Sequence, residues 1–174
     1  MTRVFLDATT LISLGSIGEL GLLRNFSGDL VVLPAVQSEV DTEPARTNLQ
    51  SFLESHDIEY GDLGYEEQIP RAMSLLEEPE RNGDVEIIAA VLTLREDDRP
   101  AGVVSDDRRI RTTGDAFGAT VTGTIGVVVR AVEEGLSESA GLDILERIDS
   151  RGLHTTGELR EKAESLIREA AEDV

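Results

Sequence analysis

The stretch Val4-Phe5-Leu6-Asp7-Ala8-Thr9-Thr10-Leu11-Ile12 decides the fold. A short aliphatic run followed at once by an acid and two threonines predicts a buried strand at 3–6 that turns directly into a helix. A similar arrangement returns at Val103-Val104-Ser105-Asp106-Asp107, after which a helix is expected. Acids therefore lie where the predicted strands end and the helices begin.

Predicted strands and helices alternate along most of the chain. Strands are expected at 3–6, 30–33, 57–60, 101–104 and 119–121. Helices are expected at 7–14, 16–25, 34–40, 46–54, 66–78, 84–95, 107–113, 123–134, 137–148 and from 156 onwards. This alternation predicts an α/β fold, a three-layer α/β/α sandwich with a central parallel sheet covered on both faces. Ligands of such sheets bind outside the carboxyl ends of the strands, where Asp7 and Asp107 fall.

The composition bounds the class of protein. A chain of 174 residues with 40% hydrophobic residues suggests one domain, and because aromatics make up only 3%, its core must be aliphatic. The absence of cysteine excludes disulfides, thiolate metal sites and cysteine nucleophiles. No apolar run is long enough to span a membrane and no signal peptide is evident, so we expect a cytoplasmic protein.

The charge of the chain is unusual. Its 35 acidic and 16 basic residues give a net charge of −19, and Lys162 is the only lysine. This balance favours a halophilic protein that works in molar salt, where the Debye length is about 3 Å, over a mesophilic protein that is merely acidic. The charge argues against nucleic acid as a partner, but screening in high salt weakens that objection.

Four carboxylates are the candidate catalytic and metal-binding groups: Asp7, Glu39, Asp84 and Asp107. Taken singly, each has a structural explanation, as a helix N-cap, a first-turn acid or a solvated side chain. Together they fall at the predicted carboxyl edge of the sheet. Clustered carboxylates repel one another, and a divalent cation relieves that repulsion. The pattern predicts a metal-dependent phosphodiesterase, most simply a nuclease.

Two neighbouring acids are second choices for the same site. Glu86 lies two residues after Asp84, and the two point to different faces of the helix, so only one of them is expected to bind metal directly. Asp106 stands in the same relation to Asp107.

The threonines near the acids are candidate substrate-binding residues. Thr9 and Thr10 either orient Asp7 and a water or cap the first helix. Thr124 belongs to Thr122-Gly123-Thr124-Ile125-Gly126, which enters a helix and could hold a phosphate on backbone N–H groups. The stretch lacks the Gly-Lys-Ser/Thr ending of a P-loop, and its glycines are better explained by close helix packing.

A basic cluster follows the last acid. Arg108, with Arg109 and Arg111, is a candidate for binding a substrate phosphate, although a solvated helix face with ion pairs explains the cluster better. His56 and His154 lie far from the acids without ligand spacing, and we interpret both as surface or packing residues.

The acidic stretches resemble the motifs of PIN domains. The resemblance rests on Val4–Ile12, Pro34–Val40, Gly83–Ala90 and Val103–Arg108, in that order along the chain. It implies a three-layer fold and Mg²⁺- or Mn²⁺-dependent cleavage of RNA, with Asp7, Glu39, Asp84 and Asp107 as the metal-binding acids. The middle of the chain, roughly 57–82, does not align with the family's pattern.

The resemblance continues past the acids. Val121–Val127 and the following helix look like a PIN-like subgroup of archaea and bacteria that carries a C-terminal extension. It implies a nuclease domain at 1–136 and a helical extension at 137–174 packed on it. Many relatives are VapC-like toxins held inactive by a small antitoxin protein, and others process ribosomal RNA. A homodimer is a further expectation from the family.

Three classes of protein are alternatives to a PIN nuclease. A haloacid-dehalogenase-like phosphatase needs a second Asp two residues after the first, where this chain has Thr9. A response-regulator receiver uses a lysine near the last strand, but Lys162 lies in the terminal helix. A catalytically silent PIN-like module that binds RNA or a protein stays open, because retained acids do not prove turnover.

Overall fold

A single parallel sheet forms the centre of the molecule. The computed structural model describes residues 1–55, 58–60, 63–151 and 155–174. Its strands are β1 (Arg3–Leu6), β2 (Asp29–Val32), β3 (Glu59–Tyr60), β4 (Ala101–Val104) and β5 (Thr120–Thr122). They lie in the order β3-β2-β1-β4-β5, and every neighbouring pair is parallel. The expected α/β fold with a central parallel sheet is therefore confirmed.

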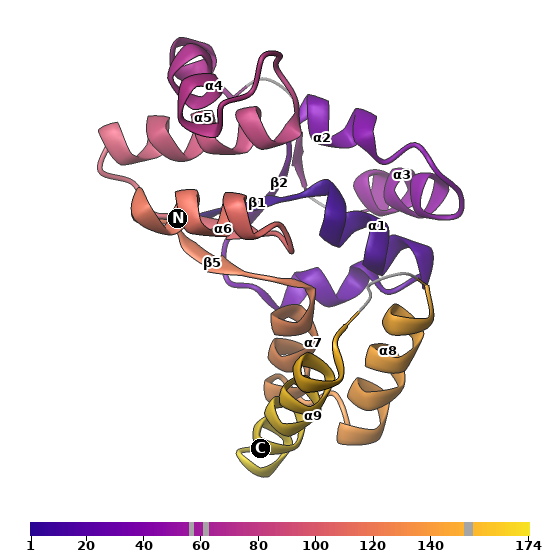
Figure 1. Ribbon diagram of the computed structural model, residues 1–174. Helices are drawn as coiled ribbons and strands as arrows, with labels where there is room; N and C mark the ends of the chain where they lie inside the picture. Colours follow the sequence, from indigo (N-terminus) through magenta and orange to yellow (C-terminus); the bar gives the residue numbers. More distant parts are fainter. Residues whose placement is uncertain (56–57, 61–62, 152–154) are drawn as a thin grey trace.

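Helices connect the strands. They are α1 (Ala8–Ser16), α2 (Pro34–Glu39), α3 (Ala45–Ser55), α4 (Ile69–Leu76), α5 (Gly83–Glu96), α6 (Arg108–Ala116), α7 (Thr124–Glu133), α8 (Glu138–Ser150) and α9 (Gly157–Glu172). The chain runs one way along the sheet from β1 to β3 and the other way from β4 to β5. Because parallel crossovers are right-handed, the two sets of helices cover opposite faces. Accordingly, α1 packs against α3 and α5 packs against α6 (Figure 1).

Two predicted helices differ from the observed elements. The stretch 16–25 is a short 3-10 helix, η1 (Leu20–Asn25), because Gly18 adopts a φ of 74° and breaks the chain away from α1. The stretch 66–78 divides into a 3-10 turn, η2 (Glu66–Gln68), and α4, whose first turn contains Pro70. Proline has no N–H to donate and is compatible with the first turn of a helix, so the α-helix begins beside it.

The core is aliphatic, as expected. The inner strands are almost entirely buried, and all four residues of β4 belong to the buried part of the chain. The hydrophobic residues of α5 are buried on every side, because this helix lies between the sheet and the neighbouring α4 and α6. The strand ends that carry the acids are therefore anchored in the best-packed part of the molecule.

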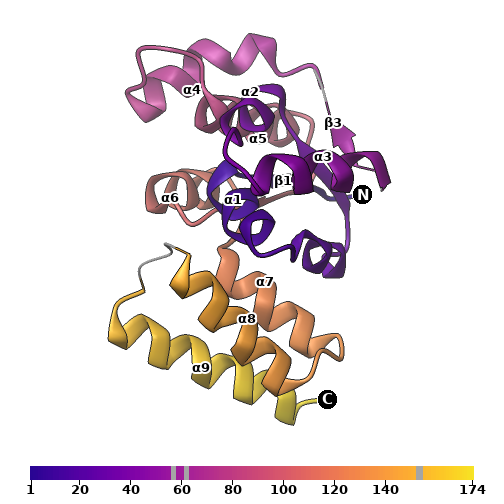
Figure 2. The same cartoon turned by 90° about the vertical axis from the view of Figure 1, so that its right-hand side faces the viewer.

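The last three helices pack against one another beside the sheet. Figures 1 and 2 show α7, α8 and α9 side by side, on one side of the rest of the chain. Gly141 of α8 allows this approach, since an added Cβ would lie 2.8 Å from a methyl of Val132 on α7. None of the helices within the described ranges has the length and apolar character needed to cross a lipid bilayer.

Candidate active site

Asp7 is the most firmly held of the candidate acids. It follows β1 directly and is only 2% exposed. Its Oδ1 accepts a hydrogen bond from Ala8 N at 2.7 Å, which caps α1, and its Oδ2 accepts from Thr9 Oγ1 at 2.8 Å and Ser105 Oγ at 2.6 Å. A buried carboxylate with several donors has one orientation, as a metal ligand or a catalytic group requires.

Ser105 is a residue of the site that the sequence analysis did not single out. It is buried at the end of β4, and besides donating to Asp7 it accepts a hydrogen bond from Asp107 N at 3.0 Å. This hydroxyl therefore joins the acids that follow two neighbouring strands. The signal was present in the sequence, because a small hydroxyl residue stands between a strand and an acid pair.

Asp107 caps the helix that follows it. Its Oδ1 accepts from Arg109 N at 2.7 Å and from Ile110 N at 3.2 Å. These bonds use the free N–H groups of the first turn of α6 and fix the position of the carboxylate.

Asp84 is the acid with the most perturbed environment. The N-cap of α5 is Asn82, whose side chain accepts from Val85 N, so Asp84 is not needed for capping. Its side chain is 22% exposed. Burial, followed by the negative charges of Asp7 and Asp107, raises the pKa of Asp84 to about 6. These three carboxylates are therefore close enough to repel one another.

Arg109 opposes that repulsion. Its guanidinium donates to Asp84 Oδ2 at 3.2 Å, to Glu78 Oε1 at 2.6 Å and to the carbonyl oxygen of Leu76 at 2.9 Å. It acts as a structural cation that holds α4 and α5 against α6. Arg108, the predicted phosphate-binding residue, is exposed, and its side chain makes no hydrogen bond or ion pair within the part of the chain that the structure describes.

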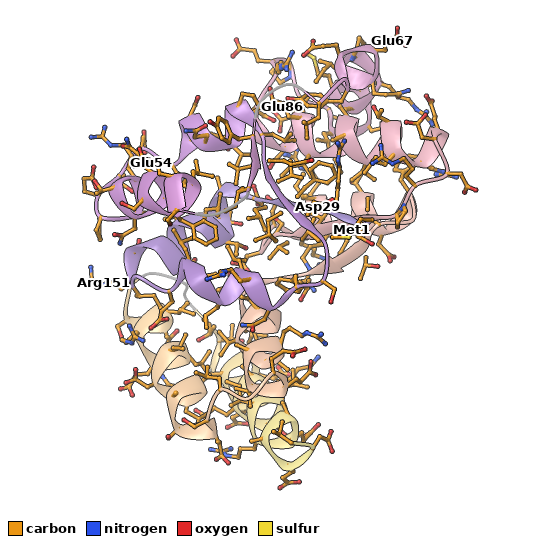
Figure 3. All side chains as sticks on the ribbon, turned by 180° about the vertical axis from the view of Figure 1, so that it is seen from behind. Met1, Asp29, Glu54, Glu67, Glu86 and Arg151 are labelled. Carbon is orange, nitrogen blue, oxygen red and sulfur yellow. The ribbon has the colours of Figure 1, made fainter. Side chains whose placement is uncertain are left out.

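Glu39 and Glu86 accept hydrogen bonds that join one helix to another segment of the chain. Glu39 Oε1 accepts from Gly83 N at 2.7 Å, so it is attached to the backbone directly before Asp84. Glu86 is 2% exposed, and its oxygens accept from Ala35 N at 2.9 Å and Arg81 Nε at 2.8 Å (Figure 3). The structure therefore places Glu39 at the edge of the site and gives Glu86 two structural partners instead.

Asp106 joins the site to α7. Its Oδ1 accepts from Thr124 N at 2.7 Å and its Oδ2 from Thr124 Oγ1 at 2.5 Å, while its own N–H donates to Thr9 Oγ1 at 3.3 Å. Thr124 is fully buried and lies 3.2 Å from Thr10 Oγ1, which is also buried. Of the predicted threonines, only Thr9 is exposed at the site.

The donor set fits a hard divalent cation. Asp7, Asp84 and Asp107 offer only oxygen atoms, and the charges of Asp7 and Asp107 add to burial in raising the pKa of Asp84 despite its contact with Arg109. Within the described ranges, however, no three Asp, Glu or His side chains are already arranged to hold an ion. Closer approach of the carboxylates would have to accompany binding. His56 and His154 lie outside the described residues.

Comparison with known proteins agrees with this geometry. A family model described as a PIN domain (DUF3368) matches residues 3–169, which is nearly the whole chain. No curated protein matches the chain. The match extends over the sheet, the carboxylate site and the three C-terminal helices.

Proposed function

This chain belongs to the PIN-domain family, and from that premise we propose that it is a metal-dependent endoribonuclease that hydrolyses RNA phosphodiester bonds. The observation that carries the proposal is the joint position of Asp7, Asp84 and Asp107, where burial, followed by the negative charges of Asp7 and Asp107, raises the pKa of Asp84 to about 6. PIN domains are usually nucleases, and a pocket of carboxylates at the carboxyl edge of a parallel sheet suits that chemistry.

The three aspartates would hold Mg²⁺ or Mn²⁺, with Glu39 at the edge of the site. A divalent cation there supplies charge neutralisation at the phosphoryl group and makes water more acidic. Asp7 is kept in one orientation by the hydrogen bonds from Ala8 N, Thr9 Oγ1 and Ser105 Oγ. Asp107 keeps its place through α6.

The residues around the acids suit the binding of a phosphodiester. Arg108 is exposed beside Asp107 and has no carboxylate partner in the described ranges, so its guanidinium is free to pair with a substrate phosphate. Thr9 presents a hydroxyl at the same edge. Thr10 and Thr124 are buried and contribute by packing and hydrogen bonding behind the site rather than by touching substrate.

The biological setting takes one of two forms. In the first, the enzyme is the toxin of a toxin–antitoxin pair and is held inactive by a small protein partner. In the second, it processes RNA without such a partner. A reading frame for a small protein directly beside this one would favour the first form, and we propose a homodimer for either.

The proposal is tested by RNA cleavage in molar KCl. Purified protein is incubated with labelled structured RNAs, with Mn²⁺ or with EDTA, alongside Asp7→Asn. Asn keeps an oxygen to cap α1 but removes the negative charge. Asp97→Asn is the matched control, because Asp97 is an exposed acid at the far end of α5.

We expect cleavage by the wild type and by Asp97→Asn that requires Mn²⁺, and loss of at least 100-fold in rate for Asp7→Asn (an order-of-magnitude estimate). Circular dichroism verifies that the variants are folded. If folded wild-type protein with Mn²⁺ cleaves none of several RNAs, or if Asp7→Asn cleaves at the wild-type rate, the nuclease proposal is overturned. The first result would favour a catalytically silent binding module.

A further inference from the structure

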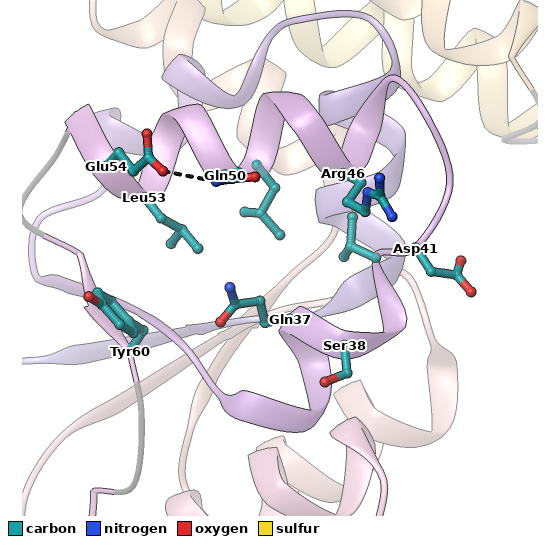
Figure 4. A pocket seen from close by; sticks show the side chains of 10 residues that line it. Gln37, Ser38, Asp41, Arg46, Gln50, Leu53, Glu54 and Tyr60 are labelled. Carbon is teal, nitrogen blue, oxygen red and sulfur yellow. Dashed lines mark hydrogen bonds between the residues drawn. The ribbon is translucent and has the colours of Figure 1, made fainter.

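A groove separate from the carboxylates lies between α2, α3 and the end of β3. It encloses about 700 Å³, within the range of small-molecule sites. Figure 4 shows Gln37 and Leu53 directed into the space between the two helices, with Tyr60 at one end. The Tyr60 side chain is unusually accessible for an aromatic residue, with 65% of its surface exposed.

The groove lies at the same edge of the sheet as Asp7. In the strand register Tyr60 pairs with Val32, one position beyond the pairing of Val31 with Phe5. Tyr60 is therefore level with Leu6, the residue before Asp7, and two strands away from it, which is roughly 10 Å across the sheet. The groove and the first of the carboxylates are therefore close to one another along the carboxyl edge of the sheet.

Helix α2 connects the two places directly. Gln37 and Ser38 line the groove, and the next residue, Glu39, reaches in the other direction to Gly83 N at the start of α5. Helix α2 therefore has the groove on one side and Gly83, the residue before Asp84, on the other, and a polymer bound at the acids that extends across α2 would reach the groove.

The chemistry of the groove suits a nucleobase better than a phosphate. Its cation, Arg46, already pairs with Glu43 at 3.0 Å, and Asp41 and Glu54 add negative charge to the lining. A phosphate would gain little there. The neutral groups are instead those that recognise an unpaired base, namely an exposed aromatic ring for stacking and glutamine amides for its polar edge.

Aliphatic side chains complete the base-sized environment. Leu49 and Leu53 of α3 form one wall, opposite Gln37 of α2. Gln50 donates an amide N–H to Glu54 at 3.0 Å, which leaves its oxygen available as an acceptor. The groove thus combines a flat ring, an apolar wall and a few oriented polar groups.

We propose that this groove binds an unpaired nucleobase of the RNA strand that runs through the carboxylate site, with the base stacked on Tyr60 and its edge hydrogen-bonded by Gln37. The inference deepens the proposed nuclease function and rests on it. It assigns to the groove the selection of single-stranded RNA, and leaves bond cleavage to the aspartates.

Tyrosine fluorescence provides a direct test of stacking. The chain has no tryptophan and two tyrosines, of which Tyr65 is 1% exposed. In a Tyr65→Phe background Tyr60 is the only strong fluorophore. Titration with a short single-stranded RNA in EDTA and molar KCl should quench it, whereas an abasic oligonucleotide with the same number of phosphates should not. Equal quenching by both, or quenching by neither, would overturn the proposal.

Cleavage kinetics with Mn²⁺ distinguish base binding in the groove from bond cleavage at the carboxylates. Tyr60→Leu should raise KM for single-stranded RNA about 10-fold with little change in kcat, since stacking on an aromatic residue is worth roughly 1–3 kcal/mol per base. Tyr60→Phe should restore the wild-type KM. Hydrolysis of bis(p-nitrophenyl) phosphate, which carries no base, should be unchanged in both variants. Leu159→Ala, at an exposed position on α9, is the control.

The two experiments fail in distinguishable ways. If RNA quenches Tyr60 but no substrate is cleaved, the groove proposal stands as RNA binding and the nuclease proposal falls. If RNA is cleaved but Tyr60→Leu leaves KM unchanged, the nuclease proposal stands and the groove proposal falls. In that case the groove is free for another occupant, such as a protein helix.

Discussion

Asp84 is a residue whose surroundings in the folded protein disfavour its charged form. Its carboxylate is partly buried beside Asp7 and Asp107, and the single contact to Arg109 does not restore its ordinary pKa. A group whose pKa is about 6 in the folded protein and near 4 in the unfolded chain binds its proton more tightly when folded. The contribution of Asp84 to the stability of the metal-free protein therefore falls as the pH rises from about 4 to about 6.

We predict that Asp84→Asn stabilises the metal-free protein above pH 6. The gain should be about 1 kcal/mol or more, after allowance for the partial exposure of the side chain. The difference should shrink as the pH falls towards 4, because wild-type Asp84 becomes neutral there. Urea unfolding in EDTA at a series of pH values measures it, with Asp97→Asn as the control. A variant that is less stable than wild type at pH 7 would contradict the argument.

The same residue should govern the response to metal. If Asp84 is a ligand, Mn²⁺ stabilises the wild type because it binds the folded state. Asp84→Asn should then show a much smaller rise in melting temperature at the same Mn²⁺ concentration, although its metal-free form is the more stable of the two. An equal rise for both proteins would remove Asp84 from the metal site.

Ser105 is a second residue whose replacement should change both stability and activity. Ser105→Ala removes the donor to Asp7 and the acceptor for Asp107 N. The loss should destabilise the protein by about 1–2 kcal/mol and lower kcat for RNA cleavage about 10-fold, because both acids lose their orientation. Ser165→Ala, on an exposed position of α9, serves as the control. If Ser105→Ala loses stability but keeps the wild-type kcat, the hydroxyl is structural only.

The individual acids could be predicted from the sequence, but their contacts could not. Asp7, Asp84 and Asp107 follow from their places at strand and helix ends, since topology alone brings those ends together. Ser105 and Arg109 depend on which side chain faces which, and that is set by packing between segments far apart in the chain. Arg109 illustrates this, because its partner Glu78 belongs to the stretch, roughly 57–82, that does not align with the family's motifs.

At the scale of elements, the predicted alternation of strands and helices gave the correct fold because each buried strand is a continuous apolar run. The order of the strands was not predicted, and it depends on the direction of each crossover. The observed helices differ from the predicted ones at two backbone features, the positive φ of Gly18 and the proline at the start of α4. Both interrupt stretches whose apolar spacing suits a helix. Apolar periodicity predicts which face is buried more reliably than where a helix begins.

Helices α2 and α5 are linked by two hydrogen bonds, in each of which a glutamate of one helix accepts from a backbone N–H at the start of the other. Glu86 of α5 accepts from Ala35 N at the start of α2, and Glu39 of α2 accepts from Gly83 N at the start of α5. Each helix thus supplies an acceptor to the free N–H groups of the other, where negative charge is also favoured by the helix dipole. The exchange fixes Asp84, which lies between Gly83 and Glu86.

We predict that Glu86→Ala destabilises the protein by about 1–3 kcal/mol, because it leaves the N–H of Ala35 without an acceptor and leaves Arg81 with Glu66 as its remaining carboxylate. Glu39→Gln should cost less than about 1 kcal/mol, since its amide oxygen still accepts from Gly83 N. Chemical denaturation measures both. If Glu86→Ala lowers the free energy of unfolding no more than Glu39→Gln does, Glu86 is not a structural partner of Ala35 and Arg81. It would then again be a candidate metal ligand.

Charge is the dominant property of the whole molecule. Acidic side chains surround it, with Glu54 and Glu67 projecting at the periphery (Figure 3). In the C-terminal helices, Arg130, Arg147, Arg160 and Arg168 each lie between two carboxylates. Such exposed pairs contribute little individually, and they leave a large excess of unpaired negative charge. At low ionic strength that excess opposes the compact state.

Salt should therefore stabilise this protein. Raising KCl from 0.1 M to 2 M shortens the Debye length from about 10 Å to 3 Å or less, which screens repulsion across the surface and also weakens the exposed ion pairs. Because a net charge of −19 makes repulsion the larger effect, the melting temperature should rise by about 10 °C or more, equivalent to roughly 3 kcal/mol.

A charge-neutralised variant distinguishes screening from a general effect of salt. Glu161→Gln combined with Glu172→Gln removes two exposed acids of α9 that have no ion-pair partner in the described ranges. The variant should be more stable than wild type in 0.1 M KCl and equal to it in 2 M KCl, because screening has already cancelled the repulsion there. A constant difference at both concentrations, or a wild-type melting temperature that does not rise with KCl, would contradict adaptation of this chain to molar salt.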